Sequence, residues 1–127
     1  MLPRRSTPVI LVVDDEVDVR DFVTMVLEDA GWAVEGAGDG REALDKMPAT
    51  RPDLVVLDLM MPVMDGWEVL DRLKHVVHPP VVVILSAYAD SARALKAGAA
   101  DCLAKPFLPG ELVDTCRRLL GADRREG

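Results

Sequence analysis

Three aspartates stand where predicted strands end. Asp14 and Asp15 follow the apolar run at residues 9–13, and Asp58 follows the run at residues 54–57. Because the carboxyl ends of parallel strands share one edge of a sheet, we expect these carboxylates to converge. Carboxylates packed in a partly dehydrated crevice repel one another, so either their pKa values rise or a cation neutralises them. Such an all-oxygen site suits Mg²⁺, or alternatively Mn²⁺, better than Ca²⁺, whose EF-hand motif is absent.

Two further residues, Ser86 and Lys105, take the corresponding places after the fourth and fifth predicted strands. An anionic phosphoryl donor can approach Asp58 only if its charge is balanced, and a metal ion with the Lys105 ammonium would balance it. Asp58 is then the nucleophile, and it becomes an acyl phosphate. Ser86 would offer its hydroxyl to a phosphoryl oxygen and draw the following loop inward only when phosphate is present. The set predicts a phosphate-dependent switch.

The elements that position these residues alternate between strands and helices. Apolar runs of strand length alternate with stretches at helical spacing, which indicates parallel strands covered on both faces. The predicted strands are residues 9–13, 32–35, 54–57, 81–85 and 99–103. We therefore predict an α/β fold: a doubly wound, five-stranded parallel sheet of flavodoxin-like order 2-1-3-4-5 in a three-layer α/β/α arrangement. The first and third strands are neighbours in this order, so ligands should bind between their ends.

The helix boundaries are predicted from caps and from glycine and proline. We expect helices at residues 16–30, from 39 to 47, around 69–73, ending near 98, and from 109 to 120. Three of these boundaries rest on single residues: Asp39 opens the second helix, Pro48 stops it, and Gly121 caps the fifth. Gly66 is expected to serve a turn or a close backbone approach.

The composition is that of one domain. The chain has 127 residues, of which 50% are apolar and 29% charged. We expect a single domain over residues 1–127, with its core at about 8–120 and flexible ends at 1–7 and 122–127. The net charge of −7 argues against nucleic-acid binding by this domain. Without a secretory signal or a run of ~18 apolar residues, we expect no membrane contact and a cytoplasmic location. Cys102 and Cys116 are predicted to be reduced thiols.

Around the strand ends stand Asp14 and Asp15, Asp58 with Met61, Pro62, Met64, Asp65 and Gly66, Ser86 with Ala87, and Lys105 with Pro106 and Phe107. This spaced set, over about residues 8–120, resembles the bacterial response-regulator receiver domain of two-component systems, which includes the chemotaxis receivers. The resemblance implies that a sensor histidine kinase or a histidine phosphotransfer protein donates the phosphoryl group. It implies no enzyme beyond catalysis of the domain's own phosphorylation and dephosphorylation at Asp58.

The resemblance also implies a ligand set and an output. Asp15, Asp58 and the Met60 carbonyl would hold Mg²⁺, with Asp14 contributing through water, and the Lys105–Pro106 bond would be cis. Output would pass through the surface built from the fourth helix, fifth strand and fifth helix. The receiver would be a monomer or weak dimer that acts on a downstream protein or on a C-terminal output domain.

Two departures from the family pattern lie on that output surface. Cys102 occupies the position, three residues before Lys105, where the family usually carries Tyr or Phe, and Tyr88 is a candidate substitute. The segment 86–98 is also about one helical turn shorter than usual. We expect a fourth helix of about two turns, near the limit for a stable element, and a mobile or partly unwound region there.

Two other functions are compatible with the same topology. A flavin-binding module would need a hydroxyl- or glycine-rich turn after the first strand, but the acidic residues 14–16 would repel its phosphate. A metal-dependent phosphatase with an aspartyl intermediate would need an acid two residues after Asp58, where Met60 stands. Trp67 is predicted to report on the nearby site by fluorescence.

Overall fold

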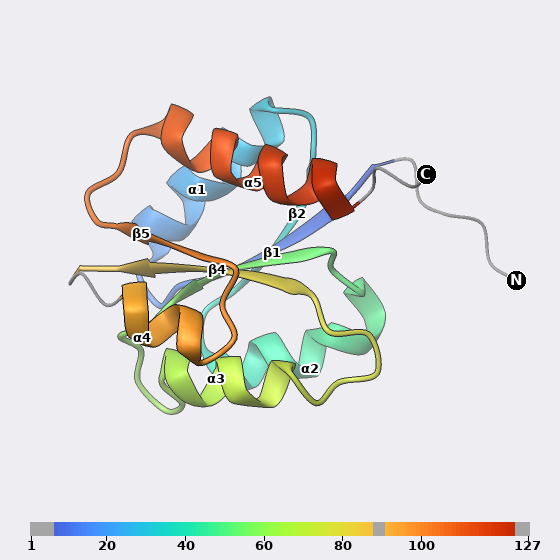
Figure 1. Cartoon of the computed structure of the whole chain (residues 1–127), viewed down its shortest axis with the longest axis vertical. Coiled ribbons are helices and arrows are strands. Elements are labelled where there is room, and N and C mark those ends of the chain that lie inside the picture. Colours follow the sequence, from blue (N-terminus) through green and yellow to red (C-terminus); the bar gives the residue numbers. More distant parts are fainter. Residues whose placement is uncertain (1–6, 88–90, 124–127) are drawn as a thin grey trace, which may run out of the picture.

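The chain folds around one parallel sheet whose strands follow the order β2-β1-β3-β4-β5, as predicted (Figure 1). The computed structural model describes residues 7–87 and 91–123. The strands are β1 (Val9–Val13), β2 (Ala33–Ala37), β3 (Leu54–Asp58), β4 (Val81–Ser86) and β5 (Asp101–Ala104). Every residue of β3 is buried, as expected for a central strand covered on both faces.

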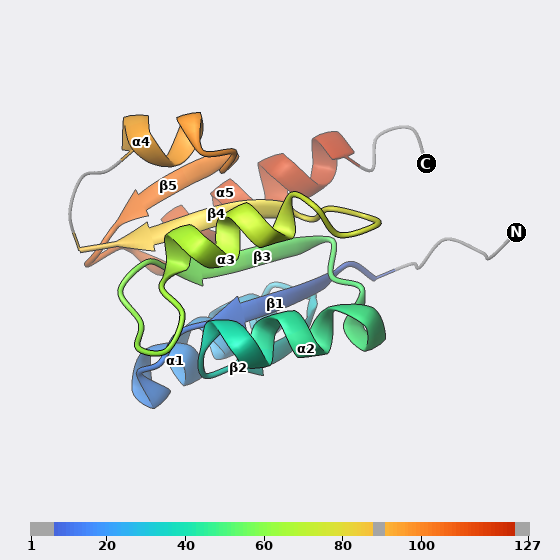
Figure 2. The ribbon, with the colours of Figure 1, turned by 90° about the horizontal axis from the view of Figure 1, so that it is seen from below.

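Helices cover both faces of this sheet. They are α1 (Val17–Asp29), α2 (Gly40–Thr50), α3 (Gly66–Leu73), α4 (Ser91–Lys96) and α5 (Pro109–Asp123). Figure 1 shows α1 and α5 above the sheet, and Figure 2 shows α2, α3 and α4 lying across its other face. The described part of the chain holds no helix with the length and apolar character needed to cross a bilayer.

Alternation along the strands separates two hydrophobic clusters. In β1, Ile10 and Val12 pack with α1 and α5, whereas Leu11 and Val13 pack with α2 and α3. Successive side chains of a strand point to opposite faces, so one apolar run serves both clusters. The sheet is thereby held from both sides, and its carboxyl edge is left for polar residues.

Aspartates cap the N-termini of two helices, α2 and α3. Asp39 accepts a hydrogen bond from the Glu42 N–H at 2.8 Å, which confirms it as the N-cap of α2. Asp65 accepts one from the Glu68 N–H at 3.0 Å and caps α3 in the same way. Asp65 is therefore a capping residue.

Two predicted helix ends are wrong. Pro48 does not stop α2, which continues to Thr50 and ends where Arg51 adopts a left-handed conformation. Proline has no N–H, so α2 loses one intrahelical hydrogen bond close to its end. The helix still closes beyond Pro48, because the Arg51 N–H donates to the Met47 carbonyl at 2.9 Å. Gly121 does not cap α5, which runs through it to Asp123.

The edge strands are displaced from their predicted bounds. β2 begins and ends later than residues 32–35, and β5 occupies Asp101–Ala104 instead of 99–103. The reason at β5 is the end of α4: Gly98 has a positive φ, and the Ala99 N–H bonds back to the Ala94 carbonyl at 3.0 Å. Ala99 therefore closes the helix instead of opening the strand.

Gly66 allows the close approach between α3 and the end of β3. A Cβ there would lie 2.5 Å from the Leu59 Cα and 2.6 Å from the Asp58 carbonyl oxygen. Both neighbours are backbone atoms, which cannot swing aside. Any larger residue must displace the segment that follows Asp58.

We predict that Gly66→Ala lowers the free energy of unfolding by about 1–3 kcal/mol, as overpacking against backbone usually does. The matched control is Gly121→Ala, because Gly121 lies inside α5 with nothing within 4 Å of the added Cβ. This control should stabilise by up to about 1 kcal/mol through helix propensity. Urea denaturation measures both; equal midpoints for the two variants would contradict the packing at Gly66.

Candidate functional site

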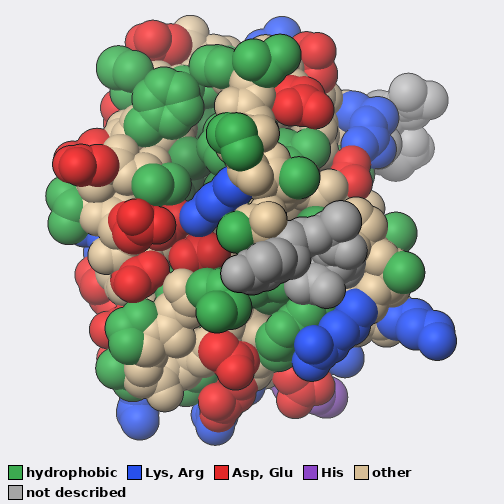
Figure 3. Space-filling model, turned by 90° about the vertical axis from the view of Figure 1, so that its left-hand side faces the viewer, with side chains coloured by type: hydrophobic (Ala, Val, Ile, Leu, Met, Phe, Trp, Pro, Cys, Tyr) green, Lys and Arg blue, Asp and Glu red, His purple; other side chains and the backbone are tan. Residues whose placement is uncertain are grey.

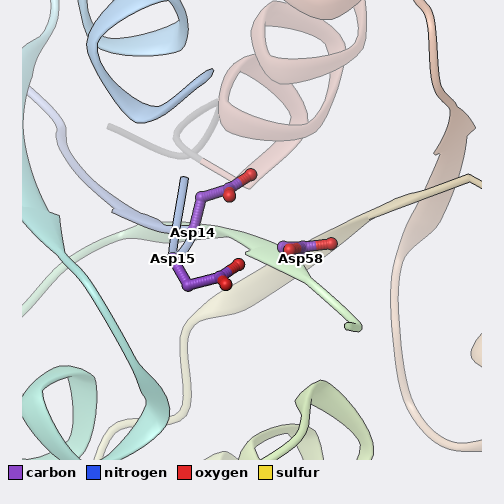
Figure 4. A group of neighbouring side chains, drawn as sticks. All are labelled: Asp14, Asp15 and Asp58. Carbon is purple, nitrogen blue, oxygen red and sulfur yellow. The ribbon is translucent and has the colours of Figure 1, made fainter. Parts of the chain in front are cut away.

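Three carboxylates converge at the carboxyl edge of the sheet. Asp14 follows β1 directly and Asp58 is the last residue of β3, and these strands are hydrogen-bonded neighbours, with Val13 opposite Leu57. Asp14, Asp15 and Asp58 each offer an oxygen, and these oxygens lie within 4.8 Å of one another (Figure 4). Asp14 and Asp58 are buried, with exposed fractions of 1% and 4%, while Asp15 is exposed. The predicted acidic cluster is therefore present.

Lys105 joins this cluster from the loop after β5. Its Nζ lies 3.2 Å from Asp14 Oδ2 and 3.4 Å from Asp58 Oδ1, although 91 residues separate Lys105 from Asp14. Figure 3 views this edge of the molecule, where acidic side chains gather beside a basic one in a hollow with hydrophobic side chains around it. The Lys105–Pro106 peptide bond is cis, as the resemblance predicted.

The charges at this site are incompletely balanced. Burial raises the pKa of Asp58 above its ordinary value and the Asp14 carboxylate raises it further, while Lys105 and the Met60 N–H only partly oppose this. Burial lowers the pKa of Lys105, but the attraction of Asp14 and Asp58 outweighs it, so this pKa is raised and the ammonium stays charged. The Lys105 cation is thus shared between Asp14 and Asp58.

The donor set fits a hard divalent cation. The ligand atoms that converge in the described part of the chain are carboxylate oxygens, with no sulfur or imidazole among them. Mg²⁺ prefers one or two carboxylates together with water and phosphate oxygens. A cation bound beside Asp58 would lower the pKa that burial and Asp14 raise. The residues present therefore fit Mg²⁺, with Mn²⁺ chemically acceptable.

Ser86 and Met60 occupy their predicted places beside the cluster. Ser86 is the last residue of β4 and is buried, and its carbonyl accepts a hydrogen bond from the Lys105 N–H at 2.7 Å. Asp58 of β3 pairs with Leu85 of β4, so Ser86 lies one residue further along β4 than the position opposite Asp58. The Met60 N–H donates to Asp58 Oδ1 at 3.3 Å, and its side chain points to solvent. Metal binding by the Met60 carbonyl stays a prediction.

Sequence reasoning missed two arginine contacts. Arg20 of α1 donates from Nη1 to the Asp14 carbonyl oxygen at 2.8 Å. Arg93 of α4 lies over the Trp67 ring of α3, 3.9 Å from its centroid. Neither contact leaves a periodic or motif-like signal, because each depends on which helices the fold brings together.

The structure describes part of the region in which departures from the family pattern were predicted. Cys102 lies half-buried in β5 and packs against the cluster beneath α2 and α3, and both cysteines are reduced thiols, as predicted. Burial raises the pKa of Cys116 to about 12, so this thiol stays protonated at neutral pH. The described α4 is six residues long, as short as predicted. Tyr88, the candidate substitute aromatic, lies outside the described residues.

Fold and site together define a class: a flavodoxin-like α/β domain with an acidic cluster at the switch point of its sheet. Residues 10–117 match the family model of the response regulator receiver domain, and the chain belongs to this family. It is the receiver domain of two-component systems.

Curated relatives of this chain agree with this family. The chain is 43% identical over 125 residues to the transcriptional regulatory protein PrrA of Mycobacterium leprae, covering 96% of this chain and 52% of the relative. It is 45% identical over 114 residues to the response regulator MprA of Mycolicibacterium vanbaalenii, covering 87% of this chain and 49% of the relative. The chain therefore spans about half the length of these regulators.

Solved receiver structures have the same fold. The receiver domain of the Francisella response regulator 1452 has a TM-score of 0.87 at 33% identity, covering 93% of this chain and all (100%) of that one. The chemotaxis protein CheY4 of Vibrio cholerae has a TM-score of 0.81 at 35% identity, covering 89% and 98%.

The raised pKa of Asp58 predicts a pH-dependent effect of Asp58→Asn on metal-free protein. A folded-state pKa above the unfolded one means that ionised Asp58 costs folding free energy once pH exceeds the unfolded pKa. At pH 7 with chelator, the asparagine variant should therefore unfold at a higher temperature than wild type. Lowering the pH through the folded pKa should shrink this difference, because wild-type Asp58 becomes neutral.

Thermal unfolding at several pH values measures this difference, and Asp71→Asn, on the exposed side of α3, is the control. A wild type that is the more stable protein at pH 7, or a pH-independent difference, would show that the cluster is already neutralised without metal.

Proposed function

We propose that Asp58 accepts a phosphoryl group from a sensor histidine kinase or a histidine phosphotransfer protein, with Mg²⁺ bound at the acidic cluster. The observation that carries this proposal is the convergence of three carboxylates and Lys105 at the ends of β1, β3 and β5. Membership of the receiver family supports it. A phosphorelay needs this combination of a nucleophilic carboxylate and positive charge for the transferred group.

Asp58 acts as the nucleophile. One of its carboxylate oxygens attacks phosphorus in line with the donor's P–N bond, and the bonding pair returns to the imidazole nitrogen as the acyl phosphate forms. Water later attacks phosphorus, the bond between phosphorus and the Asp58 oxygen breaks, and inorganic phosphate leaves as the carboxylate is regenerated. Mg²⁺ would be held by Asp15, Asp58 and the Met60 carbonyl, with Asp14 contributing through water, and it would lower the negative charge that the phosphoryl oxygens meet.

Lys105 and Ser86 would hold the transferred group. The Lys105 ammonium already bridges Asp14 and Asp58, so it needs only to shift from Asp58 to a phosphoryl oxygen. Ser86, at the end of β4, would donate its hydroxyl to another phosphoryl oxygen and so move the loop before α4. Phosphorylation would thereby alter the surface built from α4, β5 and α5.

The output would lie outside this domain. PrrA is a transcriptional regulatory protein and MprA a response regulator, and the chain matches about half of the length of each. This supports a receiver that controls a C-terminal output domain, with docking to a separate downstream protein as the other possibility. An ion pair of 2.6 Å between Asp101 of β5 and Arg118 of α5 crosses the proposed output surface.

The competing functions receive less support. A flavin phosphate would face Asp14 and Asp15 at the switch point, where like charges repel. A phosphatase of the aspartyl type would need an acid at Met60, and its exposed thioether cannot transfer protons. The matched family is one of signal receivers and not a conventional enzyme family.

We predict that incubation with Mg²⁺ and a small acyl-phosphate donor adds the mass of one phosphoryl group to the intact protein. The adduct should be absent from Asp58→Asn and suppressed by chelator, because both remove part of the proposed site. Asp71→Asn, an exposed substitution in α3, should be labelled like wild type. Intact-mass spectrometry that finds the adduct on Asp58→Asn, or finds none on wild type, would refute phosphorylation at this residue.

We also predict that phosphorylation changes the fluorescence of Trp67. This residue follows Gly66 at the start of α3, and Arg93 of α4 lies over its ring, so movement of α4 would alter its surroundings. Trp32, on the opposite face of the sheet, would be replaced by Phe to leave one reporter. The spectrum should change on adding Mg²⁺ and donor, and stay unchanged in the same protein with Asp58→Asn. A spectrum that never changes would exclude movement of α4 against α3.

A further inference from the structure

Arg20, in the first turn of α1, contacts the backbone of the acidic cluster. Its Nη1 donates to the Asp14 carbonyl oxygen at 2.8 Å. Among the ion pairs of the described residues, none joins Arg20 to a carboxylate of the cluster. Its side chain is half-buried. Arg20 therefore acts on the backbone of the metal-binding loop.

Every polar group of Asp14 has a partner. Its N–H donates to the Ala37 carbonyl at 3.1 Å, Oδ1 accepts from the Glu16 N–H at 3.0 Å, and Oδ2 accepts from Lys105 at 3.2 Å. Arg20 holds the remaining group, the carbonyl oxygen. Removing Arg20 would leave this carbonyl free to turn.

The Asp14 carbonyl also governs Asp15. The carbonyl belongs to the peptide unit that joins the two residues, and that unit is planar. Holding its oxygen therefore sets the direction in which the chain enters Asp15. Because Asp15 is the exposed member of the cluster, it is the one that burial constrains least.

The end of β2 makes room for the Arg20 side chain. A Cβ at Gly36 would lie 3.3 Å from Arg20 Cδ, and one at Gly38 would lie 3.4 Å from its Nη1. Side chains at these two positions would crowd Arg20, and Gly38 is itself held by Glu42 Oε1, which accepts its N–H at 2.8 Å. Gly36 and Gly38 therefore lie against the Arg20 side chain.

We propose that Arg20 is a positioning residue for the divalent metal site, because it fixes the Asp14–Asp15 peptide and so directs the Asp15 carboxylate toward Asp14 and Asp58. The inference rests on the proposed function, in which that cluster binds Mg²⁺. Residues that orient metal ligands in this way typically change metal affinity 10- to 100-fold when replaced.

Charge and positioning predict opposite effects of Arg20→Met on Mg²⁺ affinity. If Arg20 acted only as a nearby cation, its loss would reduce repulsion of Mg²⁺ and strengthen binding. If it positions Asp15, its loss weakens binding by about tenfold. Arg20→Lys keeps the charge but replaces the planar guanidinium with a flexible point donor, so positioning predicts weaker binding and charge alone predicts no change.

Calorimetric titration of the metal-free proteins with Mg²⁺, at one ionic strength, separates these outcomes. Arg72→Met, an exposed substitution in α3 with the same change of charge, should bind like wild type. Unchanged or tighter binding by Arg20→Met overturns the inference. If circular dichroism shows that Arg20→Met does not fold, Arg20→Lys decides in the same way, and wild-type affinity overturns the inference. Absence of Mg²⁺ binding by wild type would overturn the proposed function as well.

Discussion

Repulsion among Asp14, Asp15 and Asp58 is the constraint on which the rest of the structure depends. Two of these carboxylates are buried, and their oxygens converge within 4.8 Å. Lys105 balances part of this charge, since its Nζ lies within 3.4 Å of Asp58 and closer still to Asp14. The pKa of Asp58 remains raised despite that lysine. The site therefore favours the arrival of further positive charge and of a group on which Lys105 can act.

An apolar sheet buried on both faces stabilises the fold against this concentration of acidic side chains. The order of the strands places the ends of β1 and β3 side by side, so residues far apart in sequence meet without any local motif. Contacts made by neighbouring elements then hold the loops: Ala37 and Arg20 fix Asp14, and Gly66 lets α3 start against the segment after Asp58. Arg93 and Trp67 join α4 to α3, and Cys102 of β5 packs against the hydrophobic cluster beneath α2 and α3.

The sheet order and the main site residues could be predicted from the sequence because both follow from position at strand ends. Asp14, Asp58 and Lys105 needed only the strand boundaries to be right to within a residue or two. Helix ends depend on weaker local balances: Pro48 costs α2 one hydrogen bond that packing outweighs, and Gly121 is tolerated within α5. Arg20 could not be found in advance, since its partner is a backbone carbonyl in another element.

The most direct test of this account is the titration of the Asp58 carboxyl carbon by NMR, first in metal-free protein and then with saturating Mg²⁺. The account predicts an Asp58 pKa above its ordinary value without metal, and a clear fall when Mg²⁺ is bound. An ordinary or depressed pKa in metal-free protein, or the same pKa with and without Mg²⁺, would contradict the claim that unbalanced carboxylates at this edge create the demand for the cation.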